Sequence, residues 1–449
     1  MSVPARSALG RRDFLATTAG VTLAAAALPG CAASVDDGSG SGSGTKKGAS
    51  TLTVMAKDED KKTIQAAEQV LGVKITYLAF DQTKLNAMLA SKNPPDVVRG
   101  FGALDTPYFA ARGLMADLDP YFAESSVLKI SDLDPVNDLW RFDGEKQGAG
   151  PRYGMTKDYS QDGMFWYRTD MFDAAKLDQP SDTEPLSYDE WLDLGKRLVK
   201  RRLGKVKVYG LSAGGTLPTF MHLTASAGGK LFADDLASVD FSSPEAMKGL
   251  SWYLEYAKAN IGPSPANPNP DGWDGPTYQA GRMAMAGDGY WFGGVIGGDP
   301  KLADVSRFAP APQMGGHRIS PTFGATGYWI PEGAKNKDAA WKFFEWYFAG
   351  QPAKDRASSG WGIPALKSLR PMMPKAQPFQ KQSYAVQQQE LPYFQMMTVT
   401  PYAQTTALDA VINKVLPGAV KSGTSAGKVA DALNSQMNDA IAAGKELVG

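Results

Sequence analysis

Strand-forming and helix-forming stretches alternate at the start of the main body of this chain, and this order limits the folds available to it. Strand-type runs occupy 51–56, 73–77 and 96–98, and helix-type stretches lie between them at 60–71 and 81–91. A β-α-β-α-β order is typical of an α/β architecture with a largely parallel sheet. We therefore predict an α/β fold.

Helix signals recur in the later part of the chain. Ser187, with Glu190 three residues on, forms a capping-box pattern before an apolar helix face. Pro244 after Ser243 suits a first helical turn, and helical apolar spacing follows it. Further helices are predicted around Phe343 and around Leu433, near the end of the chain. Their apolar stripes are predicted to form core.

Composition allows a large folded body. Nearly 400 residues follow Ser50, and 43% of the whole chain is hydrophobic, enough for two lobes or domains. Lysine plus arginine and aspartate plus glutamate both count 47, so no excess positive charge is available to neutralise phosphates. We therefore do not expect a nucleic-acid partner. The protein is expected to be a monomer.

The sequence offers little support for a metal or another cofactor. Its two histidines, His222 and His317, are not in a metal-ligand spacing. His222 is interpreted as a helix-face residue and His317 as a loop residue. We expect neither a metal nor a cofactor.

Three segments rich in glycine, proline and aromatic residues separate the predicted helices: Trp273 to Tyr278, Gly287 to Gly294, and Ser359 to Pro364. An exposed tryptophan in a loop is unfavourable unless its ring covers something. Together these loops suggest a cleft lined with aromatic rings. The alternative for each ring is that it seals the edge of a lobe.

The N-terminal stretch from Arg11 to Cys31 has the order of a secretory signal: arginines, a charge-free run, then small residues before a cysteine. Arg11-Arg12 resembles a twin-arginine export signal, and Leu28-Pro29-Gly30-Cys31 resembles a bacterial lipobox. We predict a signal peptide over 1–30 and lipid attachment at Cys31. A core helix is the alternative, but the run has no amphipathic stripe.

Lipidation would use the only cysteine, so the mature fold would contain no disulfide. Residues 31–50 are then the lipidated cysteine and a Gly/Ser-rich tether, which would span roughly 20–25 Å. The predicted location is the outer face of the bacterial cell membrane, with the lipid bilayer as a partner through acylated Cys31.

Several motifs further along the chain resemble a known family. Asn93-Pro94-Pro95-Asp96-Val97-Val98 is similar to its P-D-V-V strand, and 113–118 is similar to its G-x-L-x-x-L segment. Residues 278–285, Tyr-Gln-Ala-Gly-Arg-Met-Ala-Met, followed by Gly289-Tyr290-Trp291, resemble its aromatic-x-x-G-(R/K)-x-A-M pattern ending in G-x-W. Gly362-Ile363-Pro364-Ala365 is similar to its G-x-x-P-A turn.

The family is that of the extracellular solute-binding proteins of bacterial ABC sugar importers, family 1, which are maltose-binding-protein-like. The pair formed by 153–156 and 165–172 resembles the strands that first cross between lobes, although Arg168 stands where the family usually has asparagine. The resemblance implies a two-lobed, periplasmic-binding-protein-like (type II) α/β fold with inter-lobe hinge strands. The expected boundaries are 51–160 and 323–368 for lobe 1, and 161–322 and 369–449 for lobe 2.

The resemblance also implies a carbohydrate held between the lobes by hinge closure and delivered to the membrane permease of the transporter. Sugars need flat rings that cover their apolar faces. Trp291 is the expected principal stacking platform, by the G-x-W match. Phe101, Tyr290 and Trp361 are expected as further cleft walls.

Three charged residues are expected to meet the hydroxyl groups of the sugar: Asp58 after the first strand, Arg99 after the third, and Asp158 near the first crossing. Loops at the carboxyl ends of parallel strands face the crevice between the lobes. The alternative for each is an ordinary solvated surface group.

Two other functions compete with this interpretation. One is an anchored glycoside hydrolase with two carboxylates, which would need a catalytic pair that the resemblance does not supply. The other is the same fold binding a non-sugar solute, such as a peptide, a polyamine or an anion. The sequence does not identify the sugar or its length.

Overall fold

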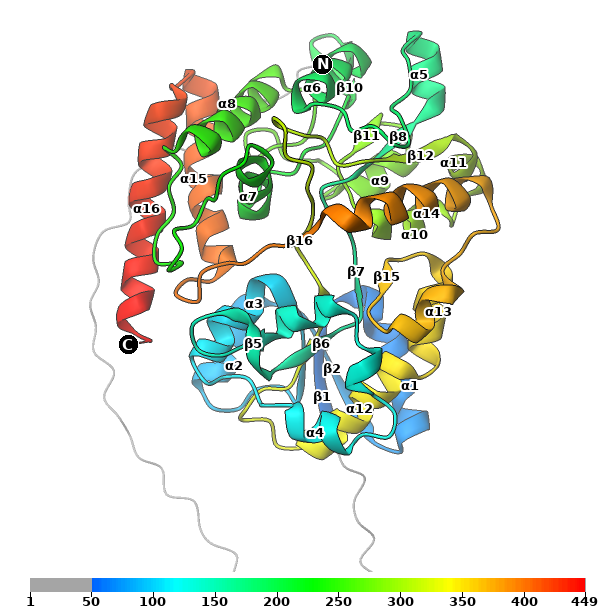
Figure 1. Cartoon of the computed structure of the whole chain (residues 1–449), viewed down its shortest axis with the longest axis vertical. Helices are drawn as coiled ribbons and strands as arrows, with labels where there is room; N and C mark the ends of the chain where they lie inside the picture. The colour runs from blue at the N-terminus through cyan, green and yellow to red at the C-terminus, as the bar shows by residue number, and fades with distance from the viewer. Residues whose placement is uncertain (1–50, 449) are drawn as a thin grey trace, which may run out of the picture. The chain divides into compact units, whose positions relative to one another are not determined.

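Residues 51–448 are described by a computed structural model (Figure 1). The predicted signal peptide, Cys31 and the tether lie outside the described residues. The described residues all belong to one compact unit, 48–449. Among them, no helix combines the length and the apolar character needed to span a membrane.

The first lobe is built around a five-stranded sheet with the order β2-β1-β3-β14-β6. β1 is parallel to β2 and β3, whereas β14 is antiparallel to β3 and β6. Its elements are β1 (Thr51–Ala56), α1 (Lys61–Leu71), β2 (Lys74–Ala79), α2 (Gln82–Ala90), β3 (Val97–Phe101), α3 (Gly102–Ala111), α4 (Asp119–Glu124), β4 (Arg141–Phe142), β5 (Gln147–Arg152), β6 (Gly154–Thr156), β14 (Thr326–Trp329), α12 (Lys337–Ala349) and α13 (Gln351–Ser359).

The predicted β-α-β-α-β start is therefore confirmed, and local signals explain its boundaries. The Asp81 side chain caps α2 by accepting a hydrogen bond from the Lys84 backbone N–H at 2.7 Å. Gly72, with a φ of 64°, ends α1 in the left-handed conformation that glycine adopts without strain. The sheet departs from the predicted largely parallel arrangement at β14. This strand is antiparallel to its neighbours because the chain enters it on its return from the other lobe.

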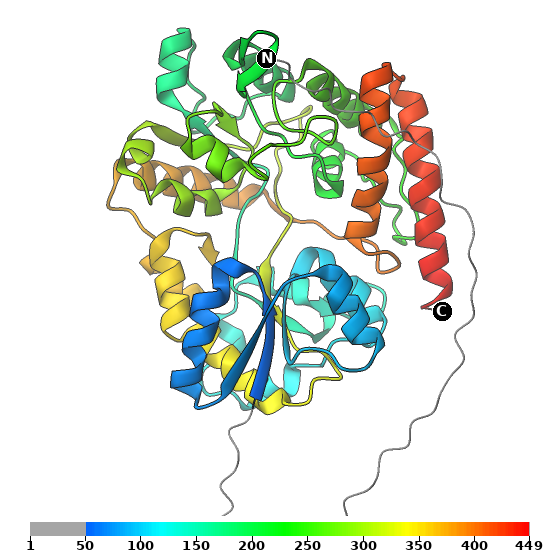
Figure 2. The same ribbon diagram turned by 180° about the vertical axis from the view of Figure 1, so that it is seen from behind.

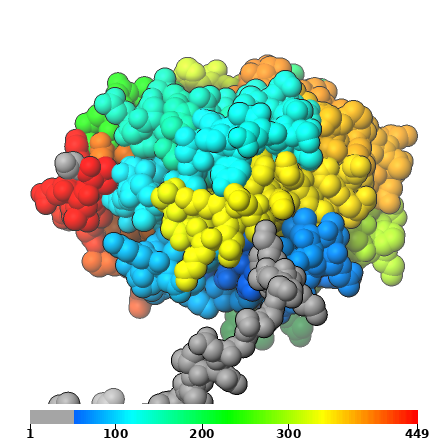
Figure 3. Space-filling view, turned by 90° about the horizontal axis from the view of Figure 1, so that it is seen from below, coloured from blue at the N-terminus to red at the C-terminus, as the bar shows by residue number. Residues whose placement is uncertain are grey.

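Helices cover both faces of this sheet. Alternate residues of β1 point to opposite faces, so Val54 packs in one core with Ile64 of α1 and Phe344 of α12. Met55 packs on the other face with Leu85 of α2 and Phe109 of α3. Figure 2 shows the blue strands from behind with helices beside them, and Figure 3 shows from below the yellow segment that includes α12 between blue and cyan segments.

The second lobe is mostly helical around a three-stranded antiparallel sheet with the order β11-β8-β12. Its elements are β8 (Phe165–Arg168), α5 (Thr169–Ala175), α6 (Tyr188–Leu198), β9 (Lys200–Arg202), β10 (Lys205–Val208), α7 (Leu217–Ser226), α8 (Pro244–Ala259), α9 (Asp274–Gln279), β11 (Met285–Ala286), α10 (Gly293–Ile296), α11 (Pro300–Val305), β12 (Ser306–Ala309), β13 (Ser320–Thr322), α14 (Pro378–Glu390), β16 (Phe394–Met396), α15 (Thr405–Ser422) and α16 (Ala426–Glu446).

The helix signals of this lobe are confirmed. Ser187 and Glu190 form a complete capping box at the start of α6. The Ser243 side chain caps α8, with Pro244 in its first turn. Leu433 of α16 is fully buried in the main core of this lobe. Sequence patterns local to each helix were sufficient to define these elements.

Three chain segments connect the two lobes. The first runs from β6 through β7 (Asp158–Tyr159) to β8, the second from β13 to β14, and the third from β15 (Ile363–Pro364) to α14. β7 pairs with β15, and β13 pairs with β16. Figure 1 shows β7, β15 and β16 between the lobes.

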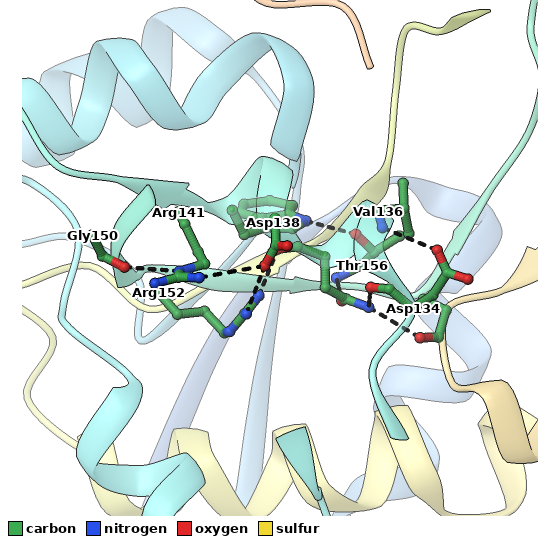
Figure 4. Close-up of polar contacts among 10 residues, drawn as sticks. Asp134, Val136, Asp138, Arg141, Gly150, Arg152 and Thr156 are labelled. Atoms are coloured by element: carbon green, nitrogen blue, oxygen red, sulfur yellow. Dashed lines mark hydrogen bonds and ion pairs between the residues drawn. The ribbon is translucent and has the colours of Figure 1, made fainter. Parts of the chain in front are cut away.

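Buried polar contacts fix the first segment at its base (Figure 4). The Arg152 guanidinium donates to Asp138 at 3.1 Å, and the Asp134 carboxylate accepts from the Val136 N–H at 3.0 Å. The Thr156 hydroxyl accepts a hydrogen bond from the Trp140 indole at 3.1 Å. The last of these contacts ties the end of β6, where the chain leaves the first lobe, to the 3₁₀ turn at Pro135–Trp140.

Candidate ligand-binding site

A cavity of about 890 Å³ is lined by residues from both lobes and from the connecting segments. The first lobe contributes Lys57, which follows β1, and Arg99 and Phe101. Arg99 lies within β3 and not after it as expected, because the strand continues to Phe101. The second lobe contributes residues from α6, α7 and α8 and from the loop at 287–291. The volume of the cavity is at the upper end of the range for small-molecule sites.

Three tryptophans gather on one wall of the cavity. The rings of Trp273 and Trp291 are stacked, with centroids 6.2 Å apart and 25° between their planes. Trp361 lies at 5.8 Å from Trp291, inclined by 53°. Trp273 lines the cavity and is 46% exposed. The three indoles form a broad apolar surface.

The position of Trp291 is set by hydrogen bonds from the first connecting segment and from β8. Its backbone N–H donates to the Ser160 hydroxyl at 3.2 Å. The preceding turn is fixed by the Trp166 indole, which donates to the Gly289 carbonyl at 3.0 Å. The platform is therefore attached to rigid elements.

The wall from the first lobe is charged. The Arg99 guanidinium lies 3.4 Å from Glu59 and 3.7 Å from Asp60, and the Lys157 ammonium lies 3.6 Å from both Asp60 and Asp158. Arg99 also lies over the ring of Phe101, at 5.0 Å from its centroid. The result is a network of alternating charges with an aromatic ring at its edge.

Mutual attraction keeps part of this network ionised despite its burial. Burial opposes the charge on Lys157, but Asp158 and Asp60 prevail and raise its pKa. Burial also opposes ionisation of Asp60, but Lys157 and Arg99 lower its pKa. Asp60 further accepts hydrogen bonds from the hydroxyls of Tyr328 at 2.9 Å and Tyr347 at 3.1 Å. Burial dominates at Asp158 and raises its pKa.

The wall from the second lobe and the first connecting segment carries two carboxyl groups, Asp162 and Asp288, that form no ion pair within the described residues. Burial raises the pKa of Asp162 to about 7, although the Phe323 backbone N–H donates to it at 2.8 Å. Burial, with Asp274 and Asp162 nearby, raises the pKa of Asp288 well above its ordinary value. Both can act as hydrogen-bond acceptors or, when protonated, as donors.

His222 is a further polar group at this wall. It lies on α7, as predicted, and its side chain is buried where it lines the cavity. Burial lowers the pKa of His222 to about 3, so the ring is neutral at physiological pH. Within residues 51–448, no cluster of three His, Cys, Asp or Glu side chains is arranged to hold a metal ion.

Five of the residues expected at the site lie on the cavity wall: Arg99, Phe101, Asp158, Trp291 and Trp361. Two do not. Asp58 accepts a hydrogen bond from the Tyr77 hydroxyl at 2.9 Å, outside the cavity. Tyr290 is only 2% exposed, and its ring packs 6.1 Å from Phe308 in the core. Successive residues of the 3₁₀ turn at 290–292 point in different directions, so Tyr290 faces inward.

The structure also brings in residues that the sequence did not identify as site residues. Trp273 belonged to a recognised aromatic loop, but nothing in the sequence showed that it meets Trp291. Lys157, Asp162 and Asp288 stood out by no motif. The only signal was their position in the chain: Lys157 and Asp162 lie close to Asp158, and Asp288 directly precedes the G-x-W turn.

The fold has many solved counterparts. An ABC substrate-binding protein of Listeria monocytogenes in complex with cycloalternan is 20% identical, with a TM-score of 0.73 over 88% of this chain and 99% of that chain. A solute-binding protein of Thermotoga lettingae bound with α-D-tagatose is 20% identical, with a TM-score of 0.72 over 88% and 100%. The sugar-binding protein MalE from Xanthomonas citri is 18% identical, with a TM-score of 0.62 over 89% and 99%.

At these identities the structural likeness shows the fold, which is that of two-lobed, type II solute-binding proteins. A search of curated proteins found no match. The model of the family described as bacterial extracellular solute-binding protein matches residues 51–349, which is more than half of the chain. This match confirms the resemblance inferred from the sequence motifs. The chain belongs to the bacterial extracellular solute-binding proteins.

Proposed function

We propose that this protein is the substrate-binding lipoprotein of an ABC importer and that it captures a mono- or oligosaccharide between its lobes. The observation that carries the proposal is the wall formed by Trp273, Trp291 and Trp361 beside a network of charged side chains. Pyranose rings present an apolar face to an indole and hydroxyl groups to charged acceptors and donors. Similar structures contain cycloalternan, α-D-tagatose and mannobiose, which supports a saccharide ligand here.

Within this proposal, Trp291 is the principal stacking platform, and Phe101 and Trp361 are further walls. Arg99 and Asp158 are the proposed partners of sugar hydroxyl groups, because both line the cavity and belong to the charged network. The proposed lobes are 51–160 with 323–368 and 161–322 with 369–449, which close around the ligand. A closed state is favoured only by contacts that the open state lacks.

The proposed route of action begins with export and lipid attachment at Cys31. The anchor and the tether would keep the binding protein close to the membrane, beside the permease that accepts the sugar. Acylation is testable by mass spectrometry of the membrane fraction. An intact N-terminal peptide or an unmodified Cys31 would contradict this part of the proposal.

The test of sugar binding is isothermal titration of the chain from Gly48, the compact unit, with a panel of mono- and oligosaccharides. We expect saturable binding of at least one sugar, and at least about tenfold weaker binding after Trp291→Ala. Trp346→Ala is the matched control, because Trp346 lies on α12 and does not line the cavity.

Three outcomes would contradict the proposal. If Trp346→Ala weakened sugar binding as much as Trp291→Ala, Trp291 would not be the stacking platform. Binding of a peptide, a polyamine or an anion in place of every sugar would assign another ligand class. Turnover of a glycoside, abolished by one carboxylate substitution, would instead identify the anchored hydrolase.

A further inference from the structure

A dense cluster of positive charge lies on the second lobe, away from the residues that line the cavity. Seven of the twelve residues 196–207 are lysine or arginine, and no acidic residue occurs from 194 to 233. The chain as a whole has no net charge, so this segment is a strong local departure. It comprises the end of α6 and the two-stranded hairpin of β9 and β10.

Part of this charge has partners in the protein. Lys196 forms an ion pair with Glu255 at 2.5 Å, and Arg197 lies 3.8 Å from Asp193. Arg201 donates to the carbonyls of Ala259 and Asn260, both at 2.8 Å, at the C-terminal end of α8. This pairing with a helix terminus fixes the hairpin to the body of the lobe.

The other four cations are exposed and form no ion pair within the described residues: Lys200, Arg202, Lys205 and Lys207. Arg202 and Lys205 are directly opposite each other in the ladder. Lys200 shares their face, because side chains alternate along a strand. Like charges directly opposite each other destabilise a strand pair, so this arrangement reduces the stability of the free hairpin.

The tip of the hairpin is also unfavourable for the isolated protein. Leu203 and Gly204 form the two-residue turn, with φ angles of 50° and 74°. Such turns favour asparagine, aspartate or glycine at the first position, and a leucine there is strained. Leu203 is nevertheless 94% exposed, so its apolar side chain contributes no packing that would offset the strain. Strain at an exposed apolar tip indicates a functional contact.

We propose that the β9–β10 hairpin docks on anionic phospholipid headgroups, with the four free cations at the headgroups and Leu203 inserted between them. A lipid interface accepts both features at once, because its surface is negative and its acyl boundary is apolar. An acidic protein segment would satisfy the cations but would offer no apolar layer for a single projecting leucine. The proposal is independent of the sugar ligand.

The test is co-sedimentation of the chain from Gly48, which carries no acyl group, with vesicles of phosphatidylcholine with and without phosphatidylglycerol. We expect binding only when phosphatidylglycerol is present, and weaker binding as salt is raised. Replacement of the four free cations by glutamine is expected to weaken binding by at least about tenfold. The matched control replaces four exposed lysines elsewhere by glutamine: Lys62, Lys74, Lys84 and Lys428.

A second variant separates the tip from the charge. Leu203→Asn is expected to raise thermal stability, because asparagine tolerates the left-handed conformation, and to weaken vesicle binding. Several results would overturn the proposal: no binding that depends on phosphatidylglycerol, equal losses in the hairpin variant and the control, or capture of an acidic peptide without vesicle binding. Sugar titration on the same samples tests the cavity separately.

Discussion

The carboxyl group of Asp162 accepts a hydrogen bond from the backbone N–H of Phe323 at 2.8 Å, although the two residues are 161 positions apart. Asp162 lies in the first segment that connects the lobes, and Phe323 lies in the second. The Asp162 N–H also donates to the Pro321 carbonyl at 2.8 Å. Two connecting segments are thus joined at the floor of the cavity.

Burial of Asp162, which outweighs this hydrogen bond, predicts a pH dependence of stability. The pKa of Asp162 is about 7 in the folded protein, well above its ordinary value, so the folded state retains a proton that the unfolded state has lost. Stability should therefore fall as pH rises from about 4 to about 7. Because the side chain is partly exposed to the cavity, we expect a loss of about 1–2 kcal/mol. Denaturant unfolding across this range measures it.

Asp162→Asn should reduce that pH dependence while keeping an oxygen for the Phe323 N–H. Asp234→Asn is the control, because Asp234 is exposed and pairs with Lys230. If the free energy of unfolding of Asp162→Asn changed with pH as it does in the parent, other carboxyl groups, such as Asp288, would carry the pH dependence.

Removal of the buried cation at position 157 should be strongly destabilising. The Lys157 side chain is 3% exposed and lies between Asp60 and Asp158, so Lys157→Met would leave both carboxylates without their ammonium partner. We expect a loss of about 3–5 kcal/mol in the free energy of unfolding. Adding Asp60→Asn and Asp158→Asn should recover part of it. A loss below about 1 kcal/mol would contradict the ion-pair interpretation.

Trp273→Ala should affect the ligand more than the fold. The Trp273 ring stacks on Trp291 and is half exposed, so its removal should cost the fold less than about 1 kcal/mol. Sugar affinity is expected to fall about fivefold to thirtyfold, as one stacking surface is lost. Thermal unfolding and titration on one sample compare the two effects. Equal affinity in the variant and the parent would remove Trp273 from the site.

Two glycines that are three residues apart, Gly324 and Gly327, should respond very differently to alanine. A Cβ atom at Gly327 would lie 1.8 Å from the Met155 carbonyl oxygen, within the pairing of β14 and β6. A Cβ atom at Gly324 would meet nothing closer than 3.4 Å. We expect Gly327→Ala to destabilise the protein by about 3 kcal/mol or more, and Gly324→Ala by less than about 1 kcal/mol. Similar losses measured by denaturant unfolding would contradict this packing.

The fold was predictable where the determining signals are local. The capping box at Ser187 and the alternating run before α2 depend on neighbours within a few residues, and both lie where expected. The antiparallel β14 was not predictable in this way. Its place between β3 and β6 depends on pairs such as Gly327 with Gly100, which are far apart in the sequence.

The site was predictable only in outline. The G-x-W motif pointed to Trp291, which lines the cavity. The neighbouring Tyr290 packs in the core, because direction within a short turn is set by packing and not by the motif. Asp58 follows β1, yet its carboxylate is held by Tyr77 from the adjacent strand. Asp162 and Asp288 become neighbours of the cavity only through long-range folding, so no short pattern marks them.

The central place of β14 in the first sheet has a consequence for the order of folding. During synthesis, β3 and β6 emerge well before residue 326. Until then both lack β14, the strand that lies between them in the finished sheet. The first lobe therefore cannot complete its sheet until the chain has passed through the second lobe. Such non-local pairing makes folding slow and leaves strand edges unpaired in the meantime. During synthesis, the first lobe should become resistant to proteolysis only after β14, residues 326–329, has emerged.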